Sequence, residues 1–238
     1  MISICIATYN GEKFIKEQLD SILCQIKDDD EIIISDDSST DDTVSIIKSY
    51  DDDRIKLLEN QTFYSPTFNF ENALKVAQGD YIFLCDQDDV WVEDKIQKMI
   101  PYLEKYDLVV SDCKVVDEHL NIINESYFEL IKSSPGFIKN FIRNGYLGCC
   151  MSFNKEILTY VLPFPKSIVM HDIWIGLWVE LYGSTIFIDK QLILFRRHSQ
   201  NTTDSAGKSK NTFIVKIKYR IVLLIELIKR GGKKRSIN

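Results

Sequence analysis

Short apolar runs alternate with segments of helical character along the first half of the chain. Five runs have the composition of buried strands: Ile2–Ala7, Glu31–Ser35, Arg54–Glu59, Tyr81–Cys85 and Asp107–Ser111. Four segments between them carry helical spacing or helix-end signals: 13–25, 41–50, 69–78 (closed by Gly79) and 94–106. Because strands and helices alternate, we expect an α/β fold with a mostly parallel central sheet flanked by helices.

The second half of the chain is less regular. Helices are expected at 134–144, 155–161 and 171–181, and short strands at 184–188 and 191–195. The Ser-, Thr-, Asn-, Lys- and Gly-rich segment 199–211 predicts a mobile loop. We divide the chain into a domain of residues 1–204, with halves 1–111 and 112–204, and a tail of residues 205–238.

Composition places the protein among ordinary soluble globular chains, with 45% hydrophobic and 27% charged residues. Met1 leads directly into the first expected strand, so we expect no secretory signal. The six cysteines show no Cys-x-x-Cys spacing and several lie in apolar runs, which indicates reduced, mostly buried thiols of a cytosolic protein. The adjacent Cys149 and Cys150 are expected to be small core residues.

The net charge of −6 is unevenly distributed. Residues 1–204 carry 19 basic and 34 acidic side chains, which argues against a nucleic-acid partner for the main domain. Residues 205–238 carry 10 basic side chains and one acidic side chain, a net charge of +9. A basic tail on an acidic body indicates that the tail meets a negatively charged surface.

Three carboxylates follow the most apolar of the expected strands. They are Asp86, Asp88 and Asp89, and in an extended segment Asp86 and Asp88 point the same way. Two like charges held together at the end of a buried strand raise each other's pKa, and a divalent cation removes that cost. Two carboxylates do not fill the coordination shell of Mg²⁺, so water or phosphate oxygens are expected to complete it. The alternative is a solvated turn that carries surface acids.

Polar residues follow two further strands, at Thr8-Tyr9-Asn10 and Asp36-Asp37. Right-handed crossovers bring the carboxyl ends of parallel strands to one rim of the sheet, where ligands bind. Three polar clusters on one rim favour a metal–phosphate site over a solvated turn.

Six segments, in chain order, resemble those of one enzyme family: 6–11 (Ile-Ala-Thr-Tyr-Asn-Gly), 35–41 (Ser-Asp-Asp-Ser-Ser-Thr-Asp), 68–73 (Phe-Asn-Phe-Glu-Asn-Ala), 86–88 (Asp-Gln-Asp), 148–153 (Gly-Cys-Cys-Met-Ser-Phe) and 171–174 (His-Asp-Ile-Trp). The chain thereby resembles the family 2 glycosyltransferases, which have the GT-A nucleotide-sugar-binding fold. The resemblance runs from Ile2 to about Asn201 and implies a nucleotide-diphosphate sugar donor. It makes residues 1–111 the donor and metal half and residues 112–204 the acceptor half.

The resemblance implies a role for each side chain at the donor site. Asp37 accepts a hydrogen bond from the N3–H of uracil or thymine, or else caps the next helix. Tyr9 stacks on the base, or else lies in the core. The remaining nucleotide-sugar-binding residues are Thr8, Asn10, Asn69, Asp86 and Gln87.

The resemblance also implies a metal centre with Mg²⁺ or Mn²⁺ as cofactor. Asp86 and Asp88 hold the ion, with Asp88 as the direct ligand, and the metal neutralises the leaving diphosphate. His198 ligates the metal or contacts the diphosphate, or else is structural. Of Arg196 and Arg197, one is expected to pair with phosphate and the other with a surface acid.

Asp172 lies where the family carries its catalytic acidic pair, and His171 replaces the usual Glu. Asp172 is therefore the expected general base, which takes the proton of the acceptor hydroxyl, or else it caps the helix that follows. A base without an enzymic nucleophile implies inversion of the anomeric configuration. The processive motif Gln-x-x-Arg-Trp is absent, which favours one sugar per encounter. Residues 171–174 and 196–201 resemble the rhamnosyltransferase-like branch, whose donors include dTDP-rhamnose.

Residues 212–230 mix apolar with basic side chains, and their longest apolar run is too short to span a bilayer. They predict an amphipathic helix that holds a cytoplasmic enzyme on the anionic inner face of the cell membrane, where lipid-linked saccharide acceptors lie. The alternative is a helix packed on the domain or on a partner subunit, as in a homodimer.

We therefore expect an inverting, non-processive transferase that moves a hexose or deoxyhexose from a UDP- or dTDP-sugar to a saccharide or lipid-linked acceptor in cell-surface polysaccharide synthesis. One alternative is a sugar-1-phosphate nucleotidyltransferase, whose usual Gly-rich loop the segment Thr8–Gly11 lacks. The other is a non-catalytic, membrane-bound nucleotide- or sugar-binding module, which has no need of Asp172.

Overall fold

The computed structural model describes residues 1–198 and 213–235, and in the last helix the side chains of residues 215 and 217–231. The strands are β1 (Ile2–Thr8), β2 (Glu31–Asp36), β3 (Ile55–Leu58), β4 (Tyr81–Asp86), β5 (Val90–Trp91), β6 (Leu108–Val116), β7 (Ile122–Asn124), β8 (Met151–Asn154) and β9 (Thr185–Arg196). The helices are α1 (Ile15–Leu23), α2 (Thr43–Lys48), α3 (Pro66–Val76), α4 (Lys95–Leu103), α5 (Tyr127–Ile131), α6 (Phe137–Ile142), α7 (Glu156–Val161), α8 (His171–Tyr182) and α9 (Phe213–Arg235). The loop expected at 199–211 lies outside the described residues.

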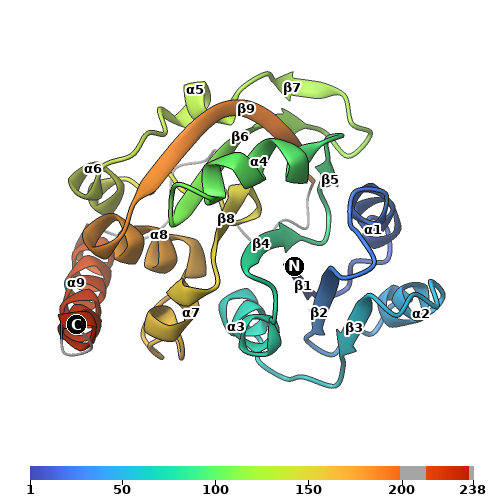
Figure 1. Ribbon diagram of the computed structural model, residues 1–238, viewed down its shortest axis with the longest axis horizontal. Coiled ribbons are helices and arrows are strands. Elements are labelled where there is room, and N and C mark those ends of the chain that lie inside the picture. Colours follow the sequence, from blue (N-terminus) through green and yellow to red (C-terminus); the bar gives the residue numbers. More distant parts are fainter. Residues whose placement is uncertain (199–212, 236–238) are drawn as a thin grey trace.

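All the strands belong to one sheet with the order β3-β2-β1-β4-β8-β6-β9-β5, and β7 pairs with β6. β1 to β4 are parallel, and so are β6 and β9, while β8 runs antiparallel between β4 and β6. Figure 1 shows α1 and α3 on opposite sides of the row formed by β1, β2 and β4. The expected α/β fold with a mostly parallel sheet is confirmed.

The central strands are apolar along their whole length because both faces of the sheet are covered. The side chains of Ile32–Ile34 in β2 and of Ile82–Leu84 in β4 are fully buried. α8 is apolar on all sides and buries Trp174 and Trp178, as expected of a helix in the core. The cysteines are mostly buried, as predicted, with Cys24 exposed.

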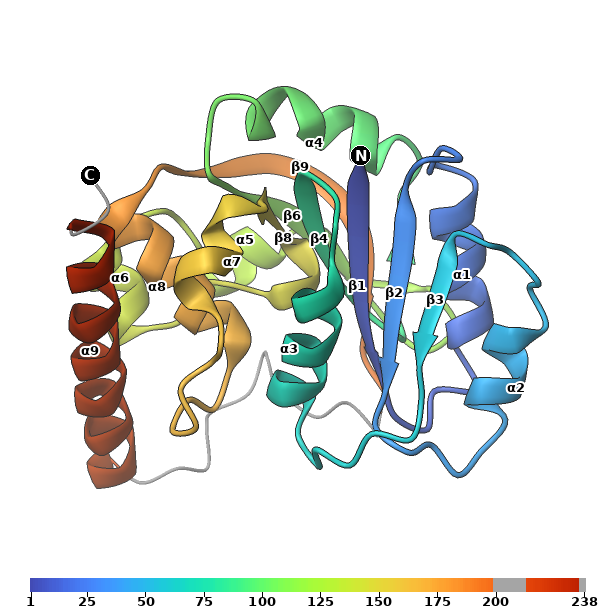
Figure 2. The same cartoon turned by 60° about the horizontal axis from the view of Figure 1, so that its bottom comes forward.

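The strand register brings the polar clusters of the sequence together. Thr8 pairs with Asp36 across β1 and β2, and Ala7 pairs with Asp86 across β1 and β4. The carboxyl ends of these strands therefore share one rim, which lies at the bottom of the sheet in Figure 2. The predicted juxtaposition of the three clusters is correct.

Several elements differ from the sequence-based prediction. The two short strands expected at 184–188 and 191–195 are one strand, β9, which pairs with β6 through two register shifts. The sequence analysis does not predict β5, β7, β8 or α5. Gly79 does not close α3, which ends at Val76; instead, a Cβ at Gly79 would lie 2.5 Å from the Ser3 nitrogen, so this position allows a close backbone approach.

The C-terminal helix α9 packs against α7 and α8, at the lower left of Figure 1. Leu223 and Leu227 are fully buried there, and the Arg230 guanidinium donates to the Leu162 carbonyl at 2.8 Å. One face of α9 is thus packed on the domain, which agrees with the alternative interpretation of the tail as a packed helix. The other face exposes a row of apolar side chains: Ile217, Ile221, Leu224, Ile225 and Ile228. Within the described residues, no helix combines the length and the apolar character needed to cross a membrane.

Candidate active site

Short polar side chains join the loops that follow β1 and β2. Asp36 accepts hydrogen bonds from the Thr8 hydroxyl at 2.9 Å and from the Ser39 amide at 2.8 Å. Asn10 has a φ of 48°, and its side-chain oxygen accepts from the Thr40 amide at 2.8 Å. Asn is among the few residue types that tolerate this left-handed conformation. Thr8 and Asn10 therefore shape the rim at which they were expected to bind the donor.

Gln87 places Tyr9 at the same rim. Its side-chain oxygen accepts from the Tyr9 amide at 2.9 Å, and its side-chain nitrogen donates to the Tyr9 carbonyl at 3.0 Å. A Cβ at Gly11 would lie 2.4 Å from the Gln87 oxygen, so glycine leaves the room that this pairing needs. Tyr9 is 56% exposed, which excludes the core alternative and leaves its ring available for stacking.

Asp37 and Asn69 are buried beside this loop. Asp37 accepts from the Phe63 amide at 2.5 Å and from the Ser65 amide at 3.2 Å. The N-cap of α2 is Asp42, so Asp37 does not cap that helix. The Asn69 side chain donates to the Thr8 carbonyl at 3.1 Å, while its oxygen is buried without a hydrogen-bond partner. Both side chains retain acceptor capacity for a ligand.

Asp88 and His198 form a close pair at the end of β4. Asp88 Oδ2 lies 2.8 Å from His198 Nε2, and the two side chains are 13% and 8% exposed. The centre of the His198 ring lies 4.6 Å from that of Phe14, which precedes α1, and the two rings are tilted by 34°. A histidine beyond the last strand of the sheet thus reaches the acid-bearing loop, and its role at a metal or a diphosphate stays a prediction.

Asp86 faces a second group of side chains. Its carboxylate, that of Asp89 and the Cys149 thiol have ligand atoms within 4.8 Å of one another. Burial, followed by the charges of Asp88 and Asp172, raises the pKa of Asp86 to about 7. A divalent cation would relieve this desolvation and repulsion, and carboxylate oxygens suit Mg²⁺ and Mn²⁺. The residues at the end of β4 therefore fit a divalent metal.

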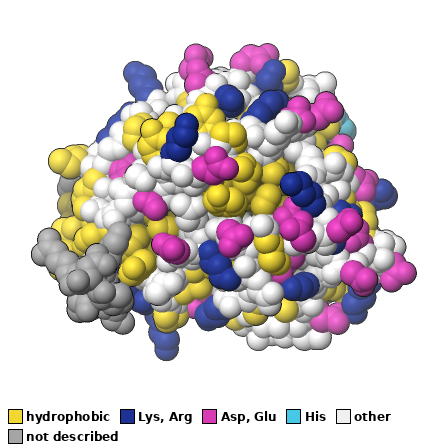
Figure 3. Space-filling model, viewed as in Figure 1, with side chains coloured by type: hydrophobic (Ala, Val, Ile, Leu, Met, Phe, Trp, Pro, Cys, Tyr) yellow, Lys and Arg dark blue, Asp and Glu magenta, His cyan; other side chains and the backbone are white. Residues whose placement is uncertain are grey.

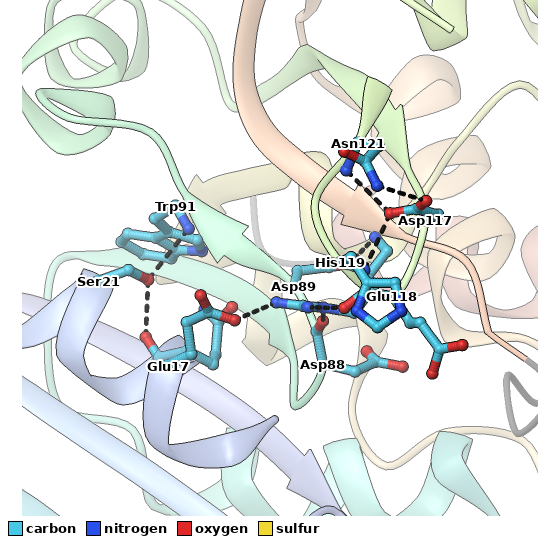
Figure 4. Close-up of polar contacts among 11 residues, drawn as sticks. Glu17, Ser21, Asp88, Asp89, Trp91, Asp117, Glu118, His119 and Asn121 are labelled. Atoms are coloured by element: carbon cyan, nitrogen blue, oxygen red, sulfur yellow. Dashed lines mark hydrogen bonds and ion pairs between the residues drawn. The ribbon is translucent and has the colours of Figure 1, made fainter. Parts of the chain in front are cut away.

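Arg196 holds the loop that carries these acids. Its guanidinium donates to the carbonyls of Asp88 and Glu118, both at 2.7 Å, and pairs with Glu17. Its backbone amide donates to Asp89 Oδ1 at 2.9 Å. Figure 4 shows Asp88 and Asp89 between Glu17 of α1 and the turn that carries Glu118. Of the two arginines Arg196 and Arg197, Arg196 thus pairs with an acidic side chain, and Arg196 is buried.

Asp172 lies in the first turn of α8, whose N-cap is Met170, so Asp172 is not the helix cap. Its carboxylate accepts from the Ile173 amide at 2.6 Å and from the Asn144 side chain at 3.2 Å. Burial is the main cause that raises the pKa of Asp172 to about 6. Such a carboxylate is ionised at neutral pH and is more basic than an exposed one, as a general base requires.

His171 is half-buried and precedes Asp172 in α8. Its ring lies 4.2 Å from that of Phe70, and burial lowers the pKa of His171 to about 3, so the imidazole is neutral. Its Nε2 has no hydrogen-bond partner, and a Cβ at Gly148 would lie 2.8 Å from it. The Gly148 segment therefore makes room for His171, and Asp172 is the ionised group of the pair.

Sequence reasoning missed three residues near Asp172. Asn144 donates to its carboxylate from a segment without a recognisable motif. Tyr219 and Arg220 reach it from α9, and burial followed by the charge of Asp172 raises the pKa of Tyr219 to about 12. The only sequence signal for the approach of α9 to Asp172 was the presence of an arginine, Arg220, within the amphipathic tail.

Comparison with known proteins identifies the family. Residues 3–162 match the family described as Glycosyl transferase family 2. The chain belongs to this family. The expected GT-A fold is confirmed by solved structures. S. aureus TarS 1–349 in complex with UDP-GlcNAc has a TM-score of 0.72 at 18% identity, over 94% of this chain and 66% of TarS. The mannosyltransferase PcManGT from Pyrobaculum calidifontis, in complex with GDP-Man and Mn²⁺, has a TM-score of 0.60 at 16% identity, over 98% and 64%.

Curated relatives of the glycosyltransferase span two donor chemistries. The Campylobacter jejuni GalNAc(5)-diNAcBac-PP-undecaprenol beta-1,3-glucosyltransferase is 30% identical over 224 residues, 92% of this chain and 71% of the relative. The Escherichia coli UDP-Glc:alpha-D-GlcNAc-diphosphoundecaprenol beta-1,3-glucosyltransferase WfaP is 42% identical over 104 residues, 44% of this chain and 41% of WfaP. The Shigella flexneri dTDP-rhamnosyl transferase RfbG is 29% identical over 223 residues, 82% and 72%. The chain spans less than two thirds of WfaP and of the two solved chains.

Proposed function

We propose that this family 2 glycosyltransferase moves one hexose or deoxyhexose from a UDP- or dTDP-sugar to a hydroxyl of a lipid-diphosphate-linked saccharide, with inversion. The observation that carries the proposal is that Asp172 lies within electrostatic reach of the acids at the end of β4. The charge of Asp172 contributes to the raised pKa of Asp86. The names of the C. jejuni, E. coli and S. flexneri relatives support the donor and acceptor classes.

The donor side is proposed to bind the nucleotide through Tyr9, Asp37 and Asn69. Asp86, Asp88 and His198 would hold Mg²⁺ or Mn²⁺, which supplies neutralisation of the leaving diphosphate when bound. Arg196 fixes the backbone of the acid-bearing loop, so these ligands are positioned before the donor arrives. The Mn²⁺ in the PcManGT complex supports a metal in this fold.

On the acceptor side, Asp172 takes the proton of the attacking hydroxyl. Its carboxylate is oriented by the Ile173 amide and by the Asn144 side chain. A hydroxyl deprotonated by Asp172 attacks the anomeric carbon from the side opposite the leaving diphosphate, which inverts the configuration. Family membership argues against the nucleotidyltransferase alternative, and a buried carboxylate with a raised pKa argues against a binding module that has no base.

A screen of nucleotide-sugar binding tests the donor assignment. Calorimetric titration with UDP-glucose, UDP-GlcNAc, dTDP-rhamnose and GDP-mannose, in Mn²⁺ and then in EDTA, should reveal one UDP- or dTDP-sugar that binds in Mn²⁺. Chelation should weaken that binding at least tenfold. Preference for GDP-mannose, or binding that EDTA leaves unchanged, would contradict the proposed donor site.

We further propose that α9 places the enzyme on an anionic membrane surface. The tail carries a net charge of +9, and α9 exposes its row of apolar side chains. Arg220 of α9 contacts the Ile142 carbonyl, and Ile138 and Ile142 of α6 are exposed as well. Figure 3 shows hydrophobic side chains at the upper left edge of the molecule, where Figure 1 places α6. Apolar and basic side chains together are the composition that binds interfacial helices to anionic lipid.

The exposed row can be tested without disturbing the packed face. The double substitution Ile221→Gln and Ile225→Gln should weaken co-sedimentation with vesicles of anionic lipid at least tenfold, because two apolar side chains are lost from the interface. Ile123→Gln on β7, where Ile123 is 60% exposed, is the matched control and should bind as wild type. Binding of the wild type should also weaken as salt rises. Equal binding by all three proteins would exclude α9 as the membrane contact.

A further inference from the structure

Helix α9 brings a guanidinium to the acceptor side of the base. Arg220 donates to the Ile142 carbonyl at 3.4 Å, and its guanidinium carbon lies 5.8 Å from the ring centres of Phe141 and Tyr219. Asn144, two residues beyond Ile142, donates to the Asp172 carboxylate. The same short segment thus contacts both the base and the guanidinium of Arg220.

The charge of Arg220 is only partly compensated. Its Nη1 is buried without a hydrogen-bond partner, and it forms no ion pair with an acid of residues 1–198 or 213–235. Burial lowers the pKa of Arg220, while the charges of Tyr219 and Asp172 oppose that change. A guanidinium remains protonated in proteins and offers five N–H donors in a planar fork. A guanidinium that is held beside the base and still has a donor without an acceptor is suited to bind an anionic ligand.

The apolar surface begins next to this cation. Ile221 follows Arg220 in α9 and is 53% exposed, and Ile142, whose carbonyl Arg220 contacts, is 72% exposed. A ligand that fits this arrangement has an anionic group beside the base and an apolar chain that continues over α6 and α9. Prenyl diphosphates have that construction.

We propose that Arg220 binds the diphosphate of a prenyl-diphosphate-linked acceptor, while the sugar attached to that diphosphate presents its hydroxyl to Asp172. This proposal rests on the proposed function and names the group by which that site recognises its acceptor. The planar fork of a guanidinium matches phosphate oxygens in a bidentate manner, which a lysine does not reproduce. The donor diphosphate is bound separately, by the acids at the end of β4.

Binding of geranyl diphosphate in EDTA tests the contact without catalysis. EDTA keeps metal away from the strand-end acids, and geraniol serves as the uncharged probe. Arg220→Gln should weaken geranyl diphosphate binding about tenfold to a hundredfold, the effect expected for losing charge-assisted hydrogen bonds, and should leave geraniol binding unchanged. Lys229→Gln is the matched control, because Lys229 lies on the same helix and pairs with Glu226 in solvent. Equal affinities of Arg220→Gln and wild type, or no binding by wild type, would overturn the proposal.

Kinetics separate acceptor recognition from an effect of Arg220 on the base. With prenyl-diphosphate-linked GlcNAc as acceptor, Arg220→Gln should raise KM at least tenfold, with the pH midpoint of kcat unchanged. With a neutral GlcNAc glycoside, Arg220→Gln should match wild type. A shifted pH midpoint and equal losses for both acceptors would mean that Arg220 tunes Asp172, which overturns the proposal. If wild type transfers to neither acceptor, the proposed function fails, whereas the binding result in EDTA stands independently.

Discussion

We expect the replacement of Asp88 with alanine to abolish detectable sugar transfer and the metal-dependent part of nucleotide binding. Asp88 lies at the end of β4, and its carboxylate faces His198 at 2.8 Å, so its loss removes the proposed direct ligand and separates the histidine from the site. The fold should persist, because the side chain is at the rim and the apolar core of β4 is unchanged. Isothermal titration with nucleotide in Mn²⁺ and a coupled assay for nucleoside diphosphate release measure both effects.

The matched control for Asp88 is Asp80, which precedes the other end of β4. Asp80 has a side chain 76% exposed and pairs with the N-terminal amine, far along the strand from the metal site. Asp80→Ala should retain wild-type transfer and metal dependence. Thermal unfolding should give similar midpoints for both variants. Normal turnover by Asp88→Ala would remove the metal site from the mechanism.

Replacing Asp172 with asparagine lowers the rate constant of transfer about 10²-fold to 10⁴-fold, the usual range for a lost general base. The amide keeps the size of the side chain and one acceptor for the Ile173 amide, so α8 should remain intact. Donor affinity should stay within a few-fold of wild type, because the proposed donor-binding residues lie at the ends of β1, β2 and β4. A collapse of donor affinity with a preserved rate constant would make Asp172 a binding residue.

The pH dependence of the transfer rate also tests the assignment of Asp172 as the general base. Asp172 acts as a base only when it is ionised, and its pKa is raised to about 6. The rate constant at saturating donor and metal should therefore be constant above pH 7 and fall tenfold per pH unit below about 6. Asp172→Asn should lack this fall. Saturating metal is needed because Asp86, with a pKa raised to about 7, also takes up a proton in this range.

The first half of the chain could be predicted from sequence because its signals are local. The apolar runs of β1, β2 and β4 are buried on both faces, and each ends at polar residues that the parallel register brings together. Tyr9, Asp37 and Asp88 accordingly lie on the expected rim. The fold class follows from the same strand–helix alternation.

The part of the chain after residue 111 depends on contacts between distant segments, which a single sequence does not reveal. Asp189 and Lys190 interrupt the apolar pattern of β9 and were interpreted as the gap between two strands, whereas they lie within one strand that shifts register on β6. Arg196 contacts Glu17, 179 positions away in sequence. Arg220 approaches the base only because Leu223 and Leu227 anchor α9 on the domain.

Two measurements together test the central claim most directly: the anomeric configuration of the product and the metal dependence of its formation. The intact chain is incubated with the nucleotide sugar that binds and with prenyl-diphosphate-linked GlcNAc, in Mn²⁺ or in EDTA, and the product is analysed by mass and by NMR of the new anomeric centre. We predict one added sugar, inverted relative to the donor, with nucleoside diphosphate released only in Mn²⁺. Retained configuration, release of sugar-1-phosphate, or full transfer in EDTA would contradict the account.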